Sequence, residues 1–321
     1  MAEQGLSMAE SKGVQNEVKE LRQGVSGWRN PRRRTDLITA AVFLLPSLIV
    51  FGVFTYFALG FNVYLSLTDW NFVSPVKRFI GLENYMTIFR DRRFLASLKV
   101  TFHYAVGTVA GSMGLGLILA LLLNQKIRGQ NFFRTVIFSP YVTTTSAIAL
   151  LWVWIFQPGT GLLHYMLSLI GIKGPRWLSD PKYAMWALII MAIWRAAGYN
   201  MVIFLSGLMN ISTEYYEAAK VDGAGTLSVL WHITLPLLSP TTFFLMVTSL
   251  IGGLQVFDAP AVMTQGGPAY ATTVMNYEIY QRAFVYMHAG DASAVAMVLF
   301  VIVAILTVLQ LTASRRWVFY Q

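Results

Sequence analysis

The 321-residue sequence contains no cysteine and few charged residues, and each shortage narrows the class of protein. Without cysteine there is neither a disulfide framework nor a thiolate site. Charged side chains make up only 12% of the residues, whereas hydrophobic residues make up 56%. Soluble domains carry about 25% charged residues, so this composition indicates a membrane protein.

Motifs that would place chemistry in this chain are also missing. The four histidines are scattered, and neither a zinc-protease helix nor a serine nucleophile elbow is present. The sequence has no phosphate-binding GxxxxGK[ST] loop either. We therefore predict a chain that is not an enzyme and holds no metal or cofactor. If it works with nucleotide energy, ATP and Mg must bind a separate partner chain.

Long apolar runs are the dominant feature that is present. A bilayer core about 30 Å thick requires about 20 apolar residues per spanning helix. Because lipid offers no hydrogen-bond partners to the backbone, runs of this length must be helical. The sequence predicts an all-α membrane protein with six transmembrane helices, at residues 37–59, 100–123, 135–156, 183–208, 241–263 and 292–311.

Positive charge flanks these runs unevenly and predicts their orientation. Arginines crowd the start of the first run and follow the last, and the short 124–134 loop is basic. An even number of spans then places both termini in the cytoplasm, with a flexible tail at 1–36, a membrane domain at 37–311 and a second tail at 312–321. The net charge of +9 suits an anionic lipid surface better than nucleic acid.

The 209–240 loop between the fourth and fifth spans is too long for a simple connection. Ser212 is a suitable N-cap for a short helix that ends before Asp222-Gly223-Ala224-Gly225. A second short helix then runs toward Pro236, which disfavours continuation. We expect a cytoplasmic helix–turn–helix, and a passive amphipathic connector is the simpler alternative.

Residue spacing in this loop follows the pattern EAA-x3-G-x9-I-x-L-P. The chain in this respect resembles the permease subunits of ABC importers. The segments at 79–85, 132–135, 139–140 and 264–268 are similar to the carbohydrate branch, which includes the maltose-type and glycerol-phosphate-type permeases. The residues that match the motif, and that the resemblance assigns to coupling with the ATPase, are Glu217, Ala218, Ala219, Gly223, Ile233, Leu235 and Pro236.

The resemblance implies a set of partners and a place in the cell. It implies a second homologous permease subunit, an ATP-binding subunit dimer and an extracytoplasmic solute-binding protein that delivers a sugar. The chain would lie in lipid, as a multi-pass protein of the cytoplasmic (inner) membrane of a bacterium or archaeon. A homodimer, or transport of glycerol 3-phosphate or another polar solute, remains open. A stand-alone secondary carrier would explain only the spans, and a membrane enzyme neither the spans nor the loop.

Polar and aromatic residues inside the spans are candidates for the solute pathway, because they are costly in lipid unless they face a cavity or a partner. Such side chains stack on sugars and bond their hydroxyls. Helix–helix contact is the alternative for each, and Arg195 could pair with Asp258. The predicted pathway residues are Trp194, Arg195, Tyr199, Asn200, Ser249, Gly252, Gly253, Gln255 and Asp258.

The resemblance to the maltose-type permeases extends to individual positions. Tyr199 and Ser249 match substrate-contact positions of those subunits, whereas the glycine pair at 252–253 and Val256 depart from them. Ser249 and Gln255 would point away from each other on one straight helix. We therefore expect a bend near the glycine pair if both face one solute.

Overall fold

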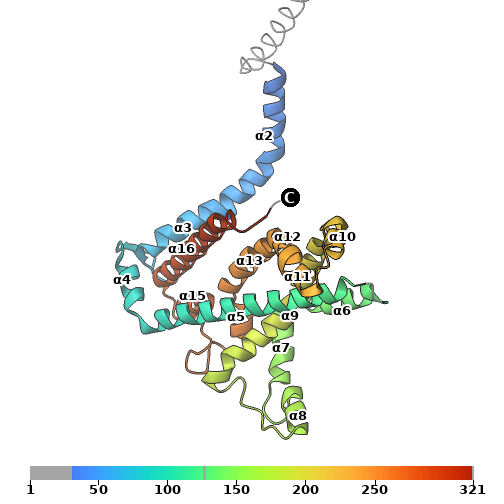
Figure 1. Ribbon diagram of the computed structural model, residues 1–321. Helices are drawn as coiled ribbons and strands as arrows, with labels where there is room; N and C mark the ends of the chain where they lie inside the picture. Colours follow the sequence, from blue (N-terminus) through green and yellow to red (C-terminus); the bar gives the residue numbers. More distant parts are fainter. Residues whose placement is uncertain (1–30, 126–127, 320–321) are drawn as a thin grey trace, which may run out of the picture. The chain divides into compact units, whose positions relative to one another are not determined.

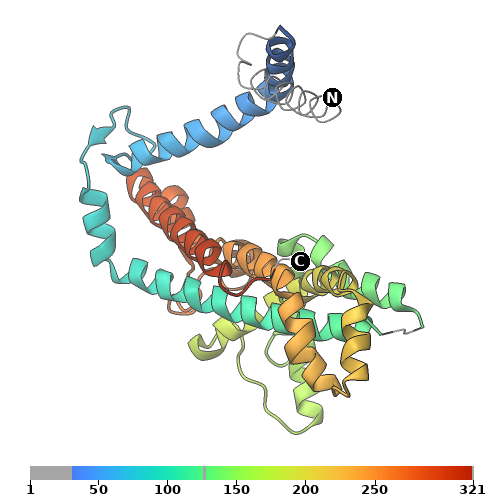
Figure 2. The same cartoon turned by 45° about the horizontal axis from the view of Figure 1, so that its top comes forward.

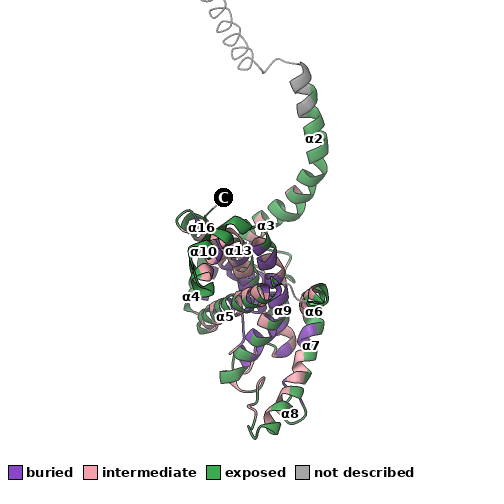
Figure 3. Cartoon of the chain, turned by 45° about the vertical axis from the view of Figure 1, so that its right-hand side comes forward, coloured by how far each residue is buried: buried purple, intermediate pink, exposed green. Residues whose placement is uncertain are grey.

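A computed structural model describes residues 31–125 and 128–319. The chain divides into two compact units, Met1–Phe61 and Asn62–Gln321. The described part of the first unit is helical, with α2 (Pro31–Phe51) followed by a π-helical stretch, η2 (Gly52–Phe57), and by α3 (Ala58–Ser66), which continues into the second unit. Its described apolar side chains are exposed along α2 (Figure 3), as expected of a helix that meets lipid. Most of the expected 1–36 tail lies outside the described residues.

The second unit contains one small hairpin and a series of helices. In the hairpin, β1 (Thr68–Asp69) pairs with β2 (Arg78–Phe79) in antiparallel register. The helices as far as the predicted loop are α4 (Glu83–Arg90), α5 (Arg92–Leu123), α6 (Gln130–Val142), α7 (Thr145–Ile155), α8 (Leu162–Leu169) and α9 (Pro181–Met209). Those that follow are α10 (Thr213–Val221), α11 (Thr226–Val229), η3 (Leu230–Thr234), α12 (Leu235–Leu237), α13 (Ser239–Leu254), α14 (Asp258–Met263), α15 (Met275–Tyr280), η4 (Gln281–Val285) and α16 (Ala289–Ser314).

The all-α fold with long apolar helices is confirmed. Over the described residues, five helices are long and apolar enough to cross a membrane, and a bent pair makes up to six. The bent pair corrects our expectation of one continuous span over 135–156. Here α6 and α7 meet at an angle of 98°. Pro140 lacks a backbone N–H and the run Val142-Thr143-Thr144-Thr145 is β-branched, so this segment favours a break.

Glycines bring α5 and α9 into close contact (Figures 1 and 2). A Cβ added at Gly111 would lie 2.2 Å from the Ile193 side chain, and one at Gly116 would lie 2.6 Å from Asn200. Gly114, in contrast, faces open space. Small residues at a helix interface let backbones approach, which is the main source of packing energy between helices in lipid. The α5–α9 pair therefore forms the centre of this unit.

An ion cluster around the buried side chains of Glu278 and Arg282 holds the start of α5 against α15, η4 and α16. Glu278 lies between Arg93 and Arg282, at 2.8 Å from each guanidinium. Arg282 also contacts Asp91, and its guanidinium lies 3.7 Å from Asp291. Buried charges are stable only when paired, so removal of one partner would be costly. In Figures 1 and 2, α10 and α11 lie at the end of this unit opposite α4.

Candidate solute pocket and coupling loop

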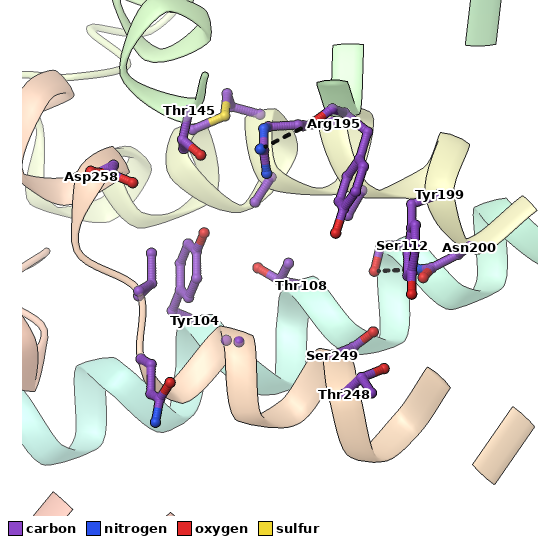
Figure 4. Close-up of a pocket in the computed structure, with 18 of the residues that line it drawn as sticks. Tyr104, Thr108, Ser112, Thr145, Arg195, Tyr199, Asn200, Thr248, Ser249 and Asp258 are labelled. Atoms are coloured by element: carbon purple, nitrogen blue, oxygen red, sulfur yellow. Dashed lines mark hydrogen bonds between the residues drawn. The ribbon is translucent and has the colours of Figure 1, made fainter. Parts of the chain in front are cut away.

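A pocket of about 370 Å³ lies among α5, α9 and α13, beside the break between α6 and α7. This volume is at the lower end of the range for small-molecule sites, about 300–1,000 Å³. Tyrosines, hydroxyls, amides, one guanidinium and one carboxylate line it together (Figure 4). The pocket therefore offers stacking surfaces, donors and acceptors to one polar solute.

Eight of the nine predicted pathway residues line this pocket. They are Arg195, Tyr199, Asn200, Ser249, Gly252, Gly253, Gln255 and Asp258, and Val256 joins them. Trp194 does not belong to the lining. Its ring meets the ring of Trp152 at a centroid distance of 5.6 Å, so it packs α9 against α7.

The helical conformation is interrupted where both Ser249 and Gln255 reach the pocket. The helix α13 ends at Leu254, and α14 begins only at Asp258. The interruption thus lies just after the glycine pair and not at it. Gly253 packs on α5, because a Cβ there would lie 3.1 Å from Ala105 Cα. Gly253 is thus a contact point for α5, and the residues that follow it supply the break.

Arg195 bonds to backbone and not to the carboxylate across the pocket. Its guanidinium donates to the carbonyl oxygens of Tyr141, at 3.3 Å, and Thr143, at 3.4 Å. It also lies 5.2 Å from the centre of the Tyr141 ring. In the described part of the chain no ion pair joins Arg195 to Asp258. The pocket thus holds a cation and a carboxylate in separate places (Figure 4).

Asn200 takes part in a helix–helix contact and also lines the pocket, the two alternatives that the sequence left open. It is 1% exposed, and its amide donates to the Ser112 hydroxyl at 3.0 Å, which joins α9 to α5. The amide oxygen is buried and has no hydrogen-bond partner among the described residues, and Asn200 is one of the residues that line the pocket. One side chain therefore holds the central helix pair together and keeps an acceptor available.

The pocket is also lined by residues of α5 and of the third span that were not among the predicted pathway residues. Tyr104, Thr108 and Ser112 line the pocket from α5. Their spacing of four residues places them on one helix face, and that polar stripe in an apolar run was a usable signal. Tyr141 and Thr145 line the pocket only because the third span bends, which the expectation of a continuous helix concealed.

The loop between α9 and α13 folds largely as its motif predicts. The Ser212 hydroxyl accepts the Glu214 backbone N–H at 3.3 Å, which confirms the N-cap of α10. Gly223 has φ of +76°, and the Ala224 N–H bonds to the Ala219 carbonyl at 2.9 Å. This is a left-handed helix C-cap, so the backbone conformation favours the glycine of the motif.

The other residues of the motif differ in how far their side chains are exposed. Glu217 and Ala218 are exposed on α10, whereas Ala219 is buried against the second half of the loop. Ile233, Leu235 and Pro236 are partly buried. The expectation that the helix would stop at Pro236 is wrong, because helical backbone continues through α12. The preceding π-helical stretch η3 changes the hydrogen-bond pattern and accommodates a residue without an N–H.

Among residues 31–125 and 128–319, no three His, Asp or Glu side chains gather in a way that could hold a metal ion.

Comparisons with known proteins identify relatives over most of the chain. The sequence is 34% identical over 280 residues to the sn-glycerol-3-phosphate transport system permease of Agrobacterium fabrum, covering 87% of this chain and 95% of that one. It is 33% identical over 277 residues to the multiple sugar-binding transport system permease of Streptococcus mutans, covering 86% and 94%.

A solved structure agrees with these relatives. It is that of a bacterial alginate ABC transporter in complex with an alginate pentasaccharide-bound periplasmic protein. One chain of it matches with a TM-score of 0.76 and 26% identity, covering 88% of this chain and 96% of that one. Residues 112–317 match the family described as the binding-protein-dependent transport system inner membrane component. The resemblance is confirmed: the chain belongs to this family of ABC importer permeases, which are non-catalytic transport subunits.

Proposed function

We propose that this chain forms one half of the pathway through which an ATP-driven importer admits a sugar, of the size of a disaccharide or a longer oligosaccharide. The pocket is the observation that carries the proposal. It combines the rings of Tyr104, Tyr141 and Tyr199 with hydroxyl and amide groups from three long helices. Aromatic faces pack on the apolar side of a sugar ring, and hydroxyl and amide groups bond its edge.

Glycerol 3-phosphate is the second candidate, since one similar permease carries that name. Phosphate sites favour several cations or a helix N-terminus, because the ligand carries nearly two negative charges. Here Arg195 is the single cation of the pocket lining, and Asp258 shares the pocket with it. This charge balance supports a neutral or weakly acidic sugar over a phosphate ester.

The loop supports ATP-driven transport. In the proposed arrangement both termini and the α10–α11 loop lie in the cytoplasm, and the exposed face of Glu217 and Ala218 docks on one subunit of an ATPase dimer that binds ATP and Mg. A second homologous permease completes the pathway, because alternating access needs two bundles that move about a central site. A binding protein delivers the sugar, as the similar alginate transporter suggests.

Uptake into proteoliposomes tests the proposal. The complete transporter, with its binding protein inside or outside the vesicle as orientation requires, is offered radiolabelled maltose, raffinose and glycerol 3-phosphate with ATP. We expect saturable, ATP-dependent uptake of a sugar and none by this chain alone. ATP-dependent uptake of glycerol 3-phosphate alone would favour the second candidate. Accumulation by the single chain on a proton or sodium gradient would favour a secondary carrier.

A further inference from the structure

The bend in the third span leaves carbonyl groups that need partners. The last carbonyls of a helix have no bond within it, and a membrane protein must satisfy them internally. Near the bend, the hydroxyl of Ser139 bonds the Val136 carbonyl at 3.0 Å, and that of Thr143 bonds the Ser139 carbonyl at 3.4 Å. These local bonds serve α6 itself and do not reach across to another helix.

Arg195, on the neighbouring helix α9, donates hydrogen bonds to carbonyl groups at the end of α6. From α9, its guanidinium donates to the carbonyls of Tyr141 and Thr143, which flank the end of α6. A cation at a helix C-terminus also interacts favourably with the helix dipole. An arginine within an apolar span is costly unless it has such partners, so these contacts give Arg195 a structural reason to be there.

The same face of α9 touches the backbone of α6 one turn later. A Cβ added at Gly198 would lie 2.1 Å from the Ile137 carbonyl oxygen, so the two helices are in backbone contact there. Residues three apart on a helix share a face. Arg195 and Gly198 therefore both contact α6: Arg195 bonds carbonyls at its end, and Gly198 packs against the backbone at its middle.

The pocket wall depends on this arrangement. Tyr141 stacks against Tyr199 at a centroid distance of 4.6 Å, and its ring lies beneath the guanidinium of Arg195. Thr145, the first residue after the bend, also lines the pocket. The Nε of Arg195 is buried and has no hydrogen-bond partner among the described residues. The guanidinium therefore borders the pocket while it bonds the bend (Figure 4).

We propose that Arg195 is a positioning residue that fixes the bend between α6 and α7 and thereby holds Tyr141 and Thr145 in the pocket wall. The importance of that wall for transport rests on the proposed function, whereas the clamp itself does not. Arginine suits this role because one nitrogen of its guanidinium bonds both carbonyls while the planar group stacks on the Tyr141 ring, and lysine has no planar group to stack.

Distance measurements across the bend test the clamp without any transported solute. The cysteine-free chain allows spin labels at two exposed positions, Asn131→Cys on α6 and Leu150→Cys on α7, in the complete transporter. We expect a narrow distance distribution with Arg195 and a broad one in Arg195→Gln, with Arg195→Lys between them. Lys182→Gln, which removes an exposed cation from the start of the same helix, is the matched control and should leave the distribution narrow.

An unchanged narrow distribution in Arg195→Gln would overturn the proposal. If Arg195→Gln does not assemble, Arg195→Lys carries the test, and a distribution equal to that of the parent would overturn it equally. Uptake of the sugar found in the proteoliposome assay gives a second readout. We expect a maximal rate about tenfold lower in Arg195→Gln, because the charge-assisted hydrogen bonds to the two carbonyls are lost, with the half-saturating concentration unchanged. A change in half-saturation alone would instead assign Arg195 to direct solute contact.

Discussion

The loop that carries the EAA motif and the pocket that we propose for the solute are encoded in the sequence in different ways. The loop is contiguous: its motif, N-cap and glycine C-cap all lie within residues 212–236, and local rules determine its shape. The pocket is assembled from α5, α9, α13 and the bend of the third span, which are far apart in the chain. Local rules therefore predict most of the loop, except that helical backbone continues past Pro236, whereas the pocket depends on packing between helices.

Glu217→Lys should have the largest effect. The side chain is exposed, and neither a hydrogen bond nor an ion pair is recorded for it in the described part of the chain, so reversal of its charge should not disturb the fold. At an interface with the ATPase, the reversal should lower uptake by at least about a hundredfold, as expected for a charge that loses its partner at an interface. Uptake by purified transporter in proteoliposomes measures this.

Glu83→Lys, an equal charge reversal on the exposed start of α4, is the control and should transport normally. Full uptake in Glu217→Lys would mean that α10 is a passive connector.

Tyr199→Ala should come next. The substitution removes a ring that lines the pocket and stacks on Tyr141. Stacking on the solute is then lost, and Tyr141 loses a contact that holds it in the pocket wall. We expect a fall in uptake of about tenfold, with ATP hydrolysis by the transporter retained. Trp194→Ala is a useful comparison on the same helix, because Trp194 lies outside the pocket lining. Equal losses in the two variants would argue against the pocket as the pathway.

The helices, and part of the pocket lining, could be predicted from the sequence, whereas the bend of the third span could not. Apolar runs predicted the helices to within a few residues at most ends, because lipid leaves the backbone no alternative. Eight of the nine residues predicted for the pathway line one pocket, and they were chosen because a polar side chain in a span is costly unless it faces a cavity or a partner. The bend at Thr143-Thr144 was missed because a hydropathy run does not record direction. The polar stripe of Tyr104, Thr108 and Ser112 was a usable signal that was not used, although which face of α5 meets α13 depends on packing between helices.

Gly223→Ala should have a moderate effect. Its φ of +76° costs an alanine about 1 kcal/mol, although the added Cβ would meet open space. We expect a severalfold loss of coupling between ATP hydrolysis and uptake. Gly223→Asn should retain more, because asparagine tolerates the left-handed region. If alanine and asparagine behave alike, the glycine is needed for the docking surface and not for the backbone.

Asn200→Ala with Ser112→Ala should show the smallest effect. The hydrogen bond between these side chains joins α9 to α5, so the double-mutant cycle should give a coupling of about 1 kcal/mol in denaturation measurements. Thermal unfolding of the assembled transporter in detergent supplies the free energies. A coupling near zero would mean that each residue serves the pocket alone.

The central claim is that the loop and the pocket are mechanically coupled: the ATPase moves α10, and this movement changes the access of water and solute to the pocket. Ser249→Cys places a single thiol in the pocket of a chain that has no other cysteine. The measurement is the rate at which a water-soluble maleimide labels that thiol in the complete transporter, with and without ATP plus vanadate. We predict a severalfold change in rate on trapping with ATP and vanadate, and the loss of that change in Glu217→Lys. An equal change in both chains, or no change in either, would contradict the account.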